Sequence, residues 1–189
     1  LEKLSGGILG IYAIDTKHNQ YIAYHANKRF PMCSTSKVMG IGAILKKSMA
    51  DPVLLKKNIK YTKTDLISWS PVTKQHVESG MTIAALGKAA ITLSDNTAIN
   101  MLIKQLGGLK AVNHFARTIG DQTFRLDRDA PDLNTALPGD LRDTSTPKAM
   151  EESLRKLVLS HLLAPKQRQL IQTWLKASRT GDARIRAGV

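Results

Sequence analysis

The chain has 189 residues, enough for one domain or for one domain and part of another. Its 42% hydrophobic residues exclude a wholly disordered chain, and no apolar run reaches the ~18 residues that a membrane span needs. Lys and Arg number 28 against 15 Asp and Glu, so the net charge is +13. This charge fits either an anionic partner or a solvated basic surface. The basic residues are spread along the chain, apart from one run: Lys46, Lys47, Lys56, Lys57, Lys60 and Lys63.

Metal, redox and nucleic-acid chemistry find little support in the composition. Cys33 is the only cysteine, and the five histidines show no close ligand spacing. The lysine run is not interleaved with aromatic residues, and no nucleic-acid recognition motif is present. We therefore expect no cofactor, no metal, no nucleic-acid partner and no membrane partner.

The N-terminal part begins with strands. Residues 8–15 form an apolar run typical of a buried strand, a turn follows at 17–19, and residues 21–24 form a second short strand. Together they predict an antiparallel hairpin. Two strands are too few for a stable sheet, so further strands must contribute.

The rest of the chain is mostly helical. Apolar spacing and end signals predict helices at 34–47, 82–91, 96–106, 109–119, from 146 onward, and 165–175. Gly40 and Gly42 weaken the first helix and indicate close packing instead. Residues 125–143, with three arginines, five aspartates and two prolines, break the periodicity and predict a functional loop. The fold class is therefore α+β, with helices segregated from a sheet.

Ser34-Thr35-Ser36-Lys37 is an S-x-x-K motif at a predicted helix start. Residues three apart share a helix face, so Lys37 can reach Ser34. A desolvated neutral lysine can take the proton that makes a serine hydroxyl nucleophilic. The same serine would also suit a helix N-cap. Ser94-Asp95-Asn96, between two predicted helices, suits either a second set of catalytic groups or the N-cap of the following helix.

In order and spacing, these motifs resemble a class A serine β-lactamase, and the resemblance runs from residue 1 to 189. It is carried by Cys33-Ser34-Thr35-Ser36-Lys37, Ser94-Asp95-Asn96, Arg125-Leu126-Asp127-Arg128, Pro131-Asp132-Leu133-Asn134-Thr135-Ala136 and Arg184-Ile185-Arg186-Ala187-Gly188. The resemblance implies a helical domain packed on an antiparallel sheet, of which this chain holds only the N-terminal strands. Residues 1–32 would be those strands, 33–175 a mainly helical domain that includes an Ω-loop at 125–143, and 176–189 the return towards the sheet.

The resemblance also implies roles. Ser34 would form the acyl-enzyme, Lys37 is a candidate base, and Ser94 would pass a proton to the leaving nitrogen. Substrate would be bound by Asn96, Asn134, Trp69 and Arg184. Arg128 and Asp143 would close the neck of the Ω-loop by an ion pair. Carbapenem-hydrolysing members have a disulfide-bonded cysteine at the position of Cys33, and some have an arginine at that of Arg184, while Trp69 matches an aromatic position at the cleft mouth. An inert buried thiol, a surface ion pair and plain packing are the alternatives for the three residues.

The chain departs from the family pattern at two points. The family's Ω-loop reads E-P-x-L-N and its glutamate activates the deacylating water, but here the position is Ala130. A methyl group accepts no proton, and Asp129 and Asp132 lie one or two residues away, so we expect deacylation to be slower by ~10²–10⁴-fold. The family's K-T-G motif, on a strand opposite the serine, does not occur in these residues. We therefore expect them to cover the first two-thirds of a longer polypeptide.

Three functions follow in order of preference. The first is β-lactam hydrolysis by a deacylation-deficient variant, with β-lactam antibiotics as substrates, a monomeric state and a periplasmic or secreted location. The second is a penicillin-binding D,D-peptidase or a covalent β-lactam sensor. The third, a basic nucleic-acid-binding module, has only the net charge in its favour.

Overall fold

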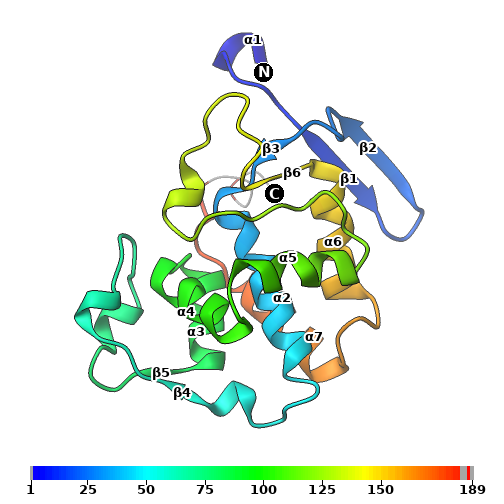
Figure 1. The fold of residues 1–189 in the computed structure, drawn as a ribbon. Coiled ribbons are helices and arrows are strands. Elements are labelled where there is room, and N and C mark those ends of the chain that lie inside the picture. The colour runs from blue at the N-terminus through cyan, green and yellow to red at the C-terminus, as the bar shows by residue number, and fades with distance from the viewer. Residues whose placement is uncertain (1, 184–186, 188–189) are drawn as a thin grey trace.

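A bundle of helices forms the centre of the molecule, and short strands lie at its margins (Figure 1). The computed structural model describes residues 2–183 and 187. Seven α-helices occur in this part of the chain: α1 (Glu2–Ser5), α2 (Lys37–Lys47), α3 (Ile83–Thr92), α4 (Asn96–Leu106), α5 (Leu109–Thr118), α6 (Pro147–Leu159) and α7 (Pro165–Lys176). Five short 3-10 helices accompany them: η1 (Cys33–Ser36), η2 (Leu54–Lys56), η3 (Lys63–Asp65), η4 (Thr73–Gln75) and η5 (Asp132–Asn134).

Helix α2 is the core element, and it contacts α3, α4, α5, α6 and α7. Its side chains Ile41 and Leu45 have no exposed surface. A Cβ atom on Gly42 would lie 2.6 Å from Leu157 Cδ2, so this glycine lets α6 approach closely. The close packing predicted from the two glycines is therefore confirmed.

The helix ends follow their local capping residues. The side chains of Thr82, Asp95 and Thr146 each accept a hydrogen bond from a backbone N–H in the first turn of α3, α4 and α6. Pro147 occupies the first turn of α6, where the lack of an N–H group removes no hydrogen bond within the helix. Gly107 ends α4 with a left-handed φ of 104°. These signals place the predicted helices within one or two residues of the observed ones, apart from the start of the first.

The strands form three two-stranded antiparallel pairs. The hairpin joins β1 (Ile11–Asp15) to β2 (Gln20–Tyr24), with Ile11 opposite Tyr24. Strand β3 (Phe30–Pro31) pairs with β6 (Thr144–Ser145), and β4 (Asn58–Ile59) pairs with β5 (Met81–Thr82). The last two pairs join segments far apart in sequence, but they are separate sheets, so no further strand joins the hairpin among the described residues.

The expected burial of the first strand is wrong for the residues described. Exposed and half-buried residues alternate along β1, and every residue of β2 is exposed. Helix α6 contacts β1 and covers one face of the hairpin only, so Ile22 keeps 70% of its surface exposed. A continuous apolar run suggests cover on both faces, and the second face has none among these residues. No described helix is long and apolar enough to cross a membrane.

Candidate active site

Ser34 lies in a 3-10 turn that leads into α2, rather than in the α-helix itself. The predicted helix start is therefore three residues early, because η1 spans Cys33–Ser36 and α2 begins at Lys37. In a 3-10 turn residues three apart are eclipsed, so Ser34 and Lys37 still meet. Lys37 Nζ lies 3.1 Å from Ser34 Oγ. The Ser34 side chain is exposed and caps neither η1 nor α2, which disfavours the capping interpretation.

The Lys37 amine is the centre of a polar cluster. Besides Ser34, Lys37 Nζ lies 2.7 Å from Ser94 Oγ, 2.8 Å from Ser94 O and 2.8 Å from Asn96 Oδ1. Ser94 Oγ is 2.9 Å from Ser34 Oγ, so the two hydroxyls and the amine form a closed triangle. A proton can pass along each side of this triangle.

Burial makes this amine a weaker base than an ordinary lysine. Lys37 is 3% exposed, and desolvation lowers its pKa from 10.5 to about 8, while the Asp95 carboxylate acts in the opposite direction. A large fraction of the amine is then neutral at mildly alkaline pH. A neutral amine has a lone pair and can accept the Ser34 proton.

Asp95 holds the S-D-N segment in place. Its buried carboxylate accepts hydrogen bonds from the backbone N–H groups of Val72, Thr73 and Ala98 and from the Thr73 hydroxyl. Ser94, the residue before it, has a backbone φ of 57°, which is uncommon for a residue other than glycine. The segment therefore caps α4, as one interpretation expects, and also directs Ser94 at Lys37. A catalytic role for it stays a prediction.

Asn96 faces the cluster rather than open solvent. It is 6% exposed; its amide oxygen accepts from Lys37, and its amide nitrogen donates to Ser68 O at 2.9 Å. Both ends of the amide are thus engaged inside the protein. A role in substrate binding remains a prediction.

A groove of about 1180 Å³ opens beside Ser34. Its polar end holds Ser34, Lys37 and Ser94, and its walls include Cys33 and Trp69. Trp69 is 66% exposed and donates from Nε1 to Leu93 O at 2.9 Å, which fixes the ring at the rim. Cys33 is a half-buried free thiol with a φ of 46°.

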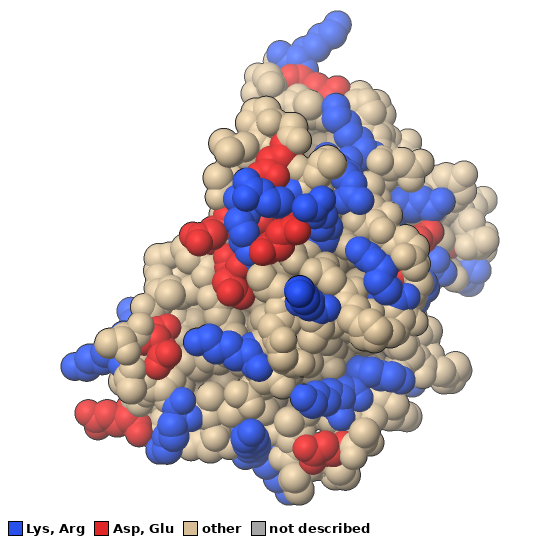
Figure 2. All heavy atoms as spheres, in the orientation of Figure 1, with Lys and Arg blue, Asp and Glu red and all other residues tan. Residues whose placement is uncertain are grey.

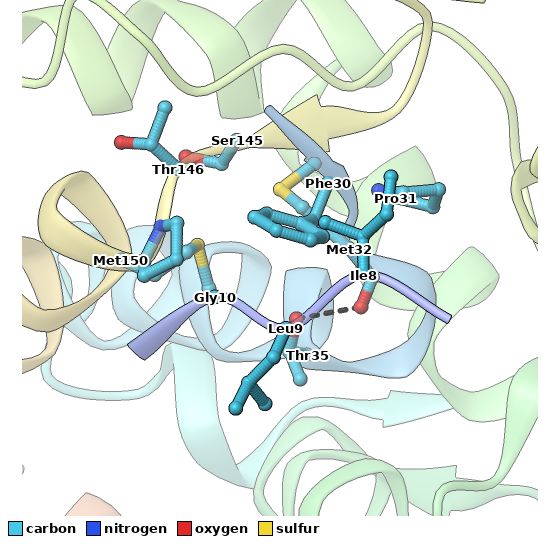
Figure 3. Close-up of a pocket in the computed structure, with 11 residues that line it drawn as sticks. Ile8, Leu9, Gly10, Phe30, Pro31, Met32, Thr35, Ser145, Thr146 and Met150 are labelled. Carbon is cyan, nitrogen blue, oxygen red and sulfur yellow. Dashed lines mark hydrogen bonds between the residues drawn. The ribbon is translucent and has the colours of Figure 1, made fainter. Parts of the chain in front are cut away.

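A smaller cavity of about 400 Å³ adjoins this groove (Figure 3). Phe30, Met32 and Met150 form part of its apolar lining. The Thr35 hydroxyl, also in the lining, donates to Met32 O at 2.6 Å. Gly10 is required here, because a Cβ atom would lie 2.4 Å from the Phe30 ring.

The loop at 125–143 is closed at its neck by charged groups. Arg128 Nε donates to Asp143 Oδ2 at 2.6 Å, which is the ion pair expected there. Asp143 is 1% exposed, and its Oδ1 accepts from the backbone N–H groups of Asp127 and Arg128 at 2.7 and 2.9 Å. Asp140 pairs with Arg142 at 2.8 Å, and this contact lowers the Asp140 pKa to about 2.

Asn100 holds the loop at Ala130, and sequence reasoning missed it. Asn100 Nδ2 donates to Ala130 O at 2.8 Å, and Ala130 N donates back to Asn100 Oδ1 at 3.1 Å. Ala130 is 5% exposed, so these backbone groups have little access to water. Asn100 lies in the middle of α4, and its partner is thirty residues away, so no local pattern could have indicated the contact.

Asn134 lies in a turn beside the serine turn, and neither it nor Ala130 has a hydrogen bond to the cluster. The η5 turn, which contains Asn134, contacts η1, and Asn134 itself is exposed. Arg184, the remaining predicted substrate-binding residue, lies outside the described residues. No group of three metal-ligating side chains occurs in the described ranges.

Comparison with known proteins agrees with this geometry. The family model described as "Beta-lactamase enzyme family" matches residues 1–189. The chain is 53% identical over its whole length to β-lactamase OXY-2 of Klebsiella oxytoca and to β-lactamase Toho-1 of Escherichia coli. It spans 65% of the length of each of these relatives.

Solved structures show the same fold. An ancestral class A β-lactamase, 51% identical, superimposes with a TM-score of 0.97, and all of this chain covers 72% of that one. A β-lactamase from Desulfarculus baarsii, 49% identical, gives a TM-score of 0.98 and is covered to 70%. The chain therefore belongs to the class A β-lactamase family and has the helix-rich α+β fold of that family.

Proposed function

We propose that the complete protein containing this chain reacts with β-lactams through a Ser34 acyl-enzyme, and that Ala130 makes it deficient in deacylation. The observation that carries the proposal is the triangle of Ser34 Oγ, Lys37 Nζ and Ser94 Oγ, with sides of 3.1, 2.7 and 2.9 Å. It joins a nucleophile, a base of lowered pKa and a hydroxyl that can relay a proton.

In the first step, Ser34 Oγ attacks the β-lactam carbonyl carbon as Lys37 Nζ takes the hydroxyl proton. The ring C–N bond then breaks, and its electron pair goes to the ring nitrogen. Ser94 Oγ gives that nitrogen a proton and is reprotonated by Lys37, so the amine ends neutral. The products are an ester on Ser34 and an opened ring with an N–H.

Hydrolysis of this ester needs a base for the attacking water. The family places that base at the position of Ala130, which offers only a methyl group. Asp129 is the nearest alternative carboxylate along the chain, and burial raises its pKa, but its side chain is one residue out of register. Slow deacylation therefore follows from the alanine at position 130, because the rest of the loop keeps the family pattern.

The absence of a base at position 130 also favours a second candidate, a natural covalent β-lactam sensor, which binds a β-lactam without turning it over. A D,D-peptidase stays a third possibility because it shares the Ser-Lys chemistry. Cys33 and Trp69 on the groove wall support a carbapenem-hydrolysing parent. A monomeric state, the proposed domain limits and a periplasmic or secreted location are proposals that rest on the family resemblance.

Intact-mass spectrometry after addition of benzylpenicillin tests the proposal. We expect a persistent adduct equal to one penicillin on Ser34, located by peptide mapping, and no adduct on Ser34→Ala. Rapid return to the free mass with accumulating penicilloate would contradict the deacylation deficiency. Absence of any adduct would contradict the acylation chemistry.

A further inference from the structure

The lysine run identified in the sequence takes no part in the proposed chemistry. Residues 46–63 hold six lysines and a single acidic residue, Asp51. They form the end of α2, the following turn, η2 and β4, at the bottom of the molecule in Figure 1. None of them lines the groove beside Ser34. We call residues 46–57 the lysine tip.

Four exposed lysines lie on this tip, and the amines of two of them meet. Lys47 Nζ and Lys57 Nζ both reach Gln105 on α4, at 3.0 and 3.3 Å, so two segments ten residues apart converge there. Lys46 and Lys56 are their sequence neighbours and are also exposed. None of the four forms an ion pair within the described part of the chain. Figure 2 shows several Lys and Arg side chains over this lower part of the molecule, with few acidic ones.

Helix stabilisation explains only part of this cluster. Lys47 donates to the carbonyl of Gln105 in the last turn of α4, where a cation favours the helix dipole. Lys46 likewise donates to Leu162 O at 3.0 Å, beyond the end of α6. One cation at the end of each helix is enough to interact with the helix dipole. The amines of Lys47 and Lys57, which both bind Gln105, are like charges that repel each other unless an anion is present.

Exposed apolar side chains lie between the two lysine pairs in the sequence. Met49 is 38% and Val53 is 68% exposed. The turn that carries them is held by hydrogen bonds from Met49 N to Lys46 O and from Leu54 N to Asp51 O, both 3.1 Å, and Leu54 is buried beneath it. Asp51 accepts from Val53 N at 3.2 Å, so the single carboxylate is engaged in the turn. The tip is thus an anchored turn with aliphatic groups flanked by cations.

We propose that the lysine tip is a peripheral docking surface for an anionic lipid bilayer, which departs from the expectation from composition that the protein has no membrane partner. Lysines near an anionic membrane surface each contribute favourably by attraction to the headgroups, and aliphatic side chains enter the headgroup boundary. A nucleic acid would use the charges but would leave Met49 and Val53 in water, and the tip has no aromatic side chain for base stacking. A peripheral contact needs no membrane span, so it is compatible with the lack of one in the described helices.

Vesicle co-sedimentation of the complete protein tests the docking surface. The probes are phosphatidylglycerol–phosphatidylcholine vesicles and pure phosphatidylcholine vesicles. We expect binding to the anionic vesicles only, weakened by salt because the attraction is electrostatic. Replacing Lys46, Lys47, Lys56 and Lys57 by Gln should weaken binding by on the order of 1,000-fold. Met49→Ser with Val53→Ser should weaken it by about tenfold and leave the salt dependence intact.

The matched control carries the same change of net charge elsewhere. Lys3, Lys17, Lys28 and Lys148 are exposed residues near the hairpin end of the molecule, and their replacement by Gln should leave vesicle binding within about twofold. Circular dichroism checks that both quadruple variants fold. Equal losses in the two would show a general charge effect and overturn the proposal. So would binding of short duplex DNA with no binding of anionic vesicles. The acylation assay on Ser34 is independent of either outcome.

Discussion

The two sides of the groove around Ser34 are built by different means. On the helical side the polar side chains of the cluster bond directly to one another. The amine of Lys37 by itself contacts three of them, on Ser34, Ser94 and Asn96. On the side of the loop at 125–143, side chains hold backbone groups, Asn100 those of Ala130 and Asp143 those of Asp127 and Arg128, besides the ion pair of Arg128 with Asp143. The polar cluster on the helical side therefore depends on bonds between its own side chains. Asn100 binds only backbone atoms of Ala130, so we expect the loop to keep its shape with another side chain at position 130, which would make loop shape and loop chemistry separable.

The strongest test of this separation is Ala130→Glu. Because the loop backbone is already held, a carboxylate there should accelerate deacylation by ~10²–10⁴-fold, the usual contribution of a positioned base. Single-turnover decay of the penicilloyl adduct measures the effect. Ala130→Gln, of similar size but unable to accept a proton at neutral pH, is the control and should stay slow. If Glu and Gln decay alike, the loop does not place residue 130 at the water.

The neck of the loop is tested by Asp143→Ala. The change leaves Arg128 and two backbone N–H groups without their buried acceptor, which should cost about 3–5 kcal/mol of the free energy of unfolding. Urea unfolding measures the cost. Asp132→Ala, an exposed aspartate of the same loop, should change stability by less than ~0.5 kcal/mol. Similar effects of the two substitutions would show that the neck contacts add little.

Asn100→Leu tests the backbone clamp at Ala130. Loss of two hydrogen bonds to a buried segment should cost about 2 kcal/mol, and in the Ala130→Glu background it should also abolish the recovered deacylation. Asn113→Leu is the matched control, because Asn113 holds the backbone of Leu126 in the same way, with bonds of 2.9 and 2.6 Å. It should cost similar stability and keep the deacylation. Equal activity in both double variants would exclude a specific role for Asn100.

The helical side is tested by the pH dependence of acylation. With a Lys37 pKa of about 8, the neutral base becomes scarcer as pH falls, so the acylation rate should drop about tenfold per pH unit below 8 and level off above it. Stopped-flow acylation measures this profile. Lys37→Arg, which stays protonated, should lose the rising limb together with the activity. A flat profile between about pH 6 and 8 would exclude Lys37 as the base.

The same lowered pKa has a consequence for stability. The unfolded chain holds the Lys37 proton up to the ordinary pKa of 10.5, whereas the folded chain releases it near 8. The cost of burying the ammonium is therefore fully present below about pH 8. This cost disappears as pH rises from 8 to 10.5, so the contribution of Lys37 to the free energy of unfolding increases over that range.

The sequence was informative where structure is local. Caps such as Asp95 and Thr146 act within three residues, so the helix positions could be predicted, and the spacing of Ser34 and Lys37 indicated their contact. The pairs β3–β6 and β4–β5 could not be found, because two-residue strands have no periodicity and depend on distant partners. The clamp by Asn100 and the exposure of the hairpin depend on tertiary packing in the same way. The assignment of Ala130 came from family resemblance and not from periodicity.

Cys33 gives this groove a built-in reporter position. It is the only thiol in the sequence, it directly precedes the nucleophile, and it lies on the groove wall with part of its surface accessible. Within these 189 residues a maleimide fluorophore or a spin label would therefore attach at Cys33 alone, when the thiol is reduced. Its emission or its line shape should change when an acyl group settles on the neighbouring hydroxyl, so occupancy of Ser34 could be followed in real time without a chromogenic substrate.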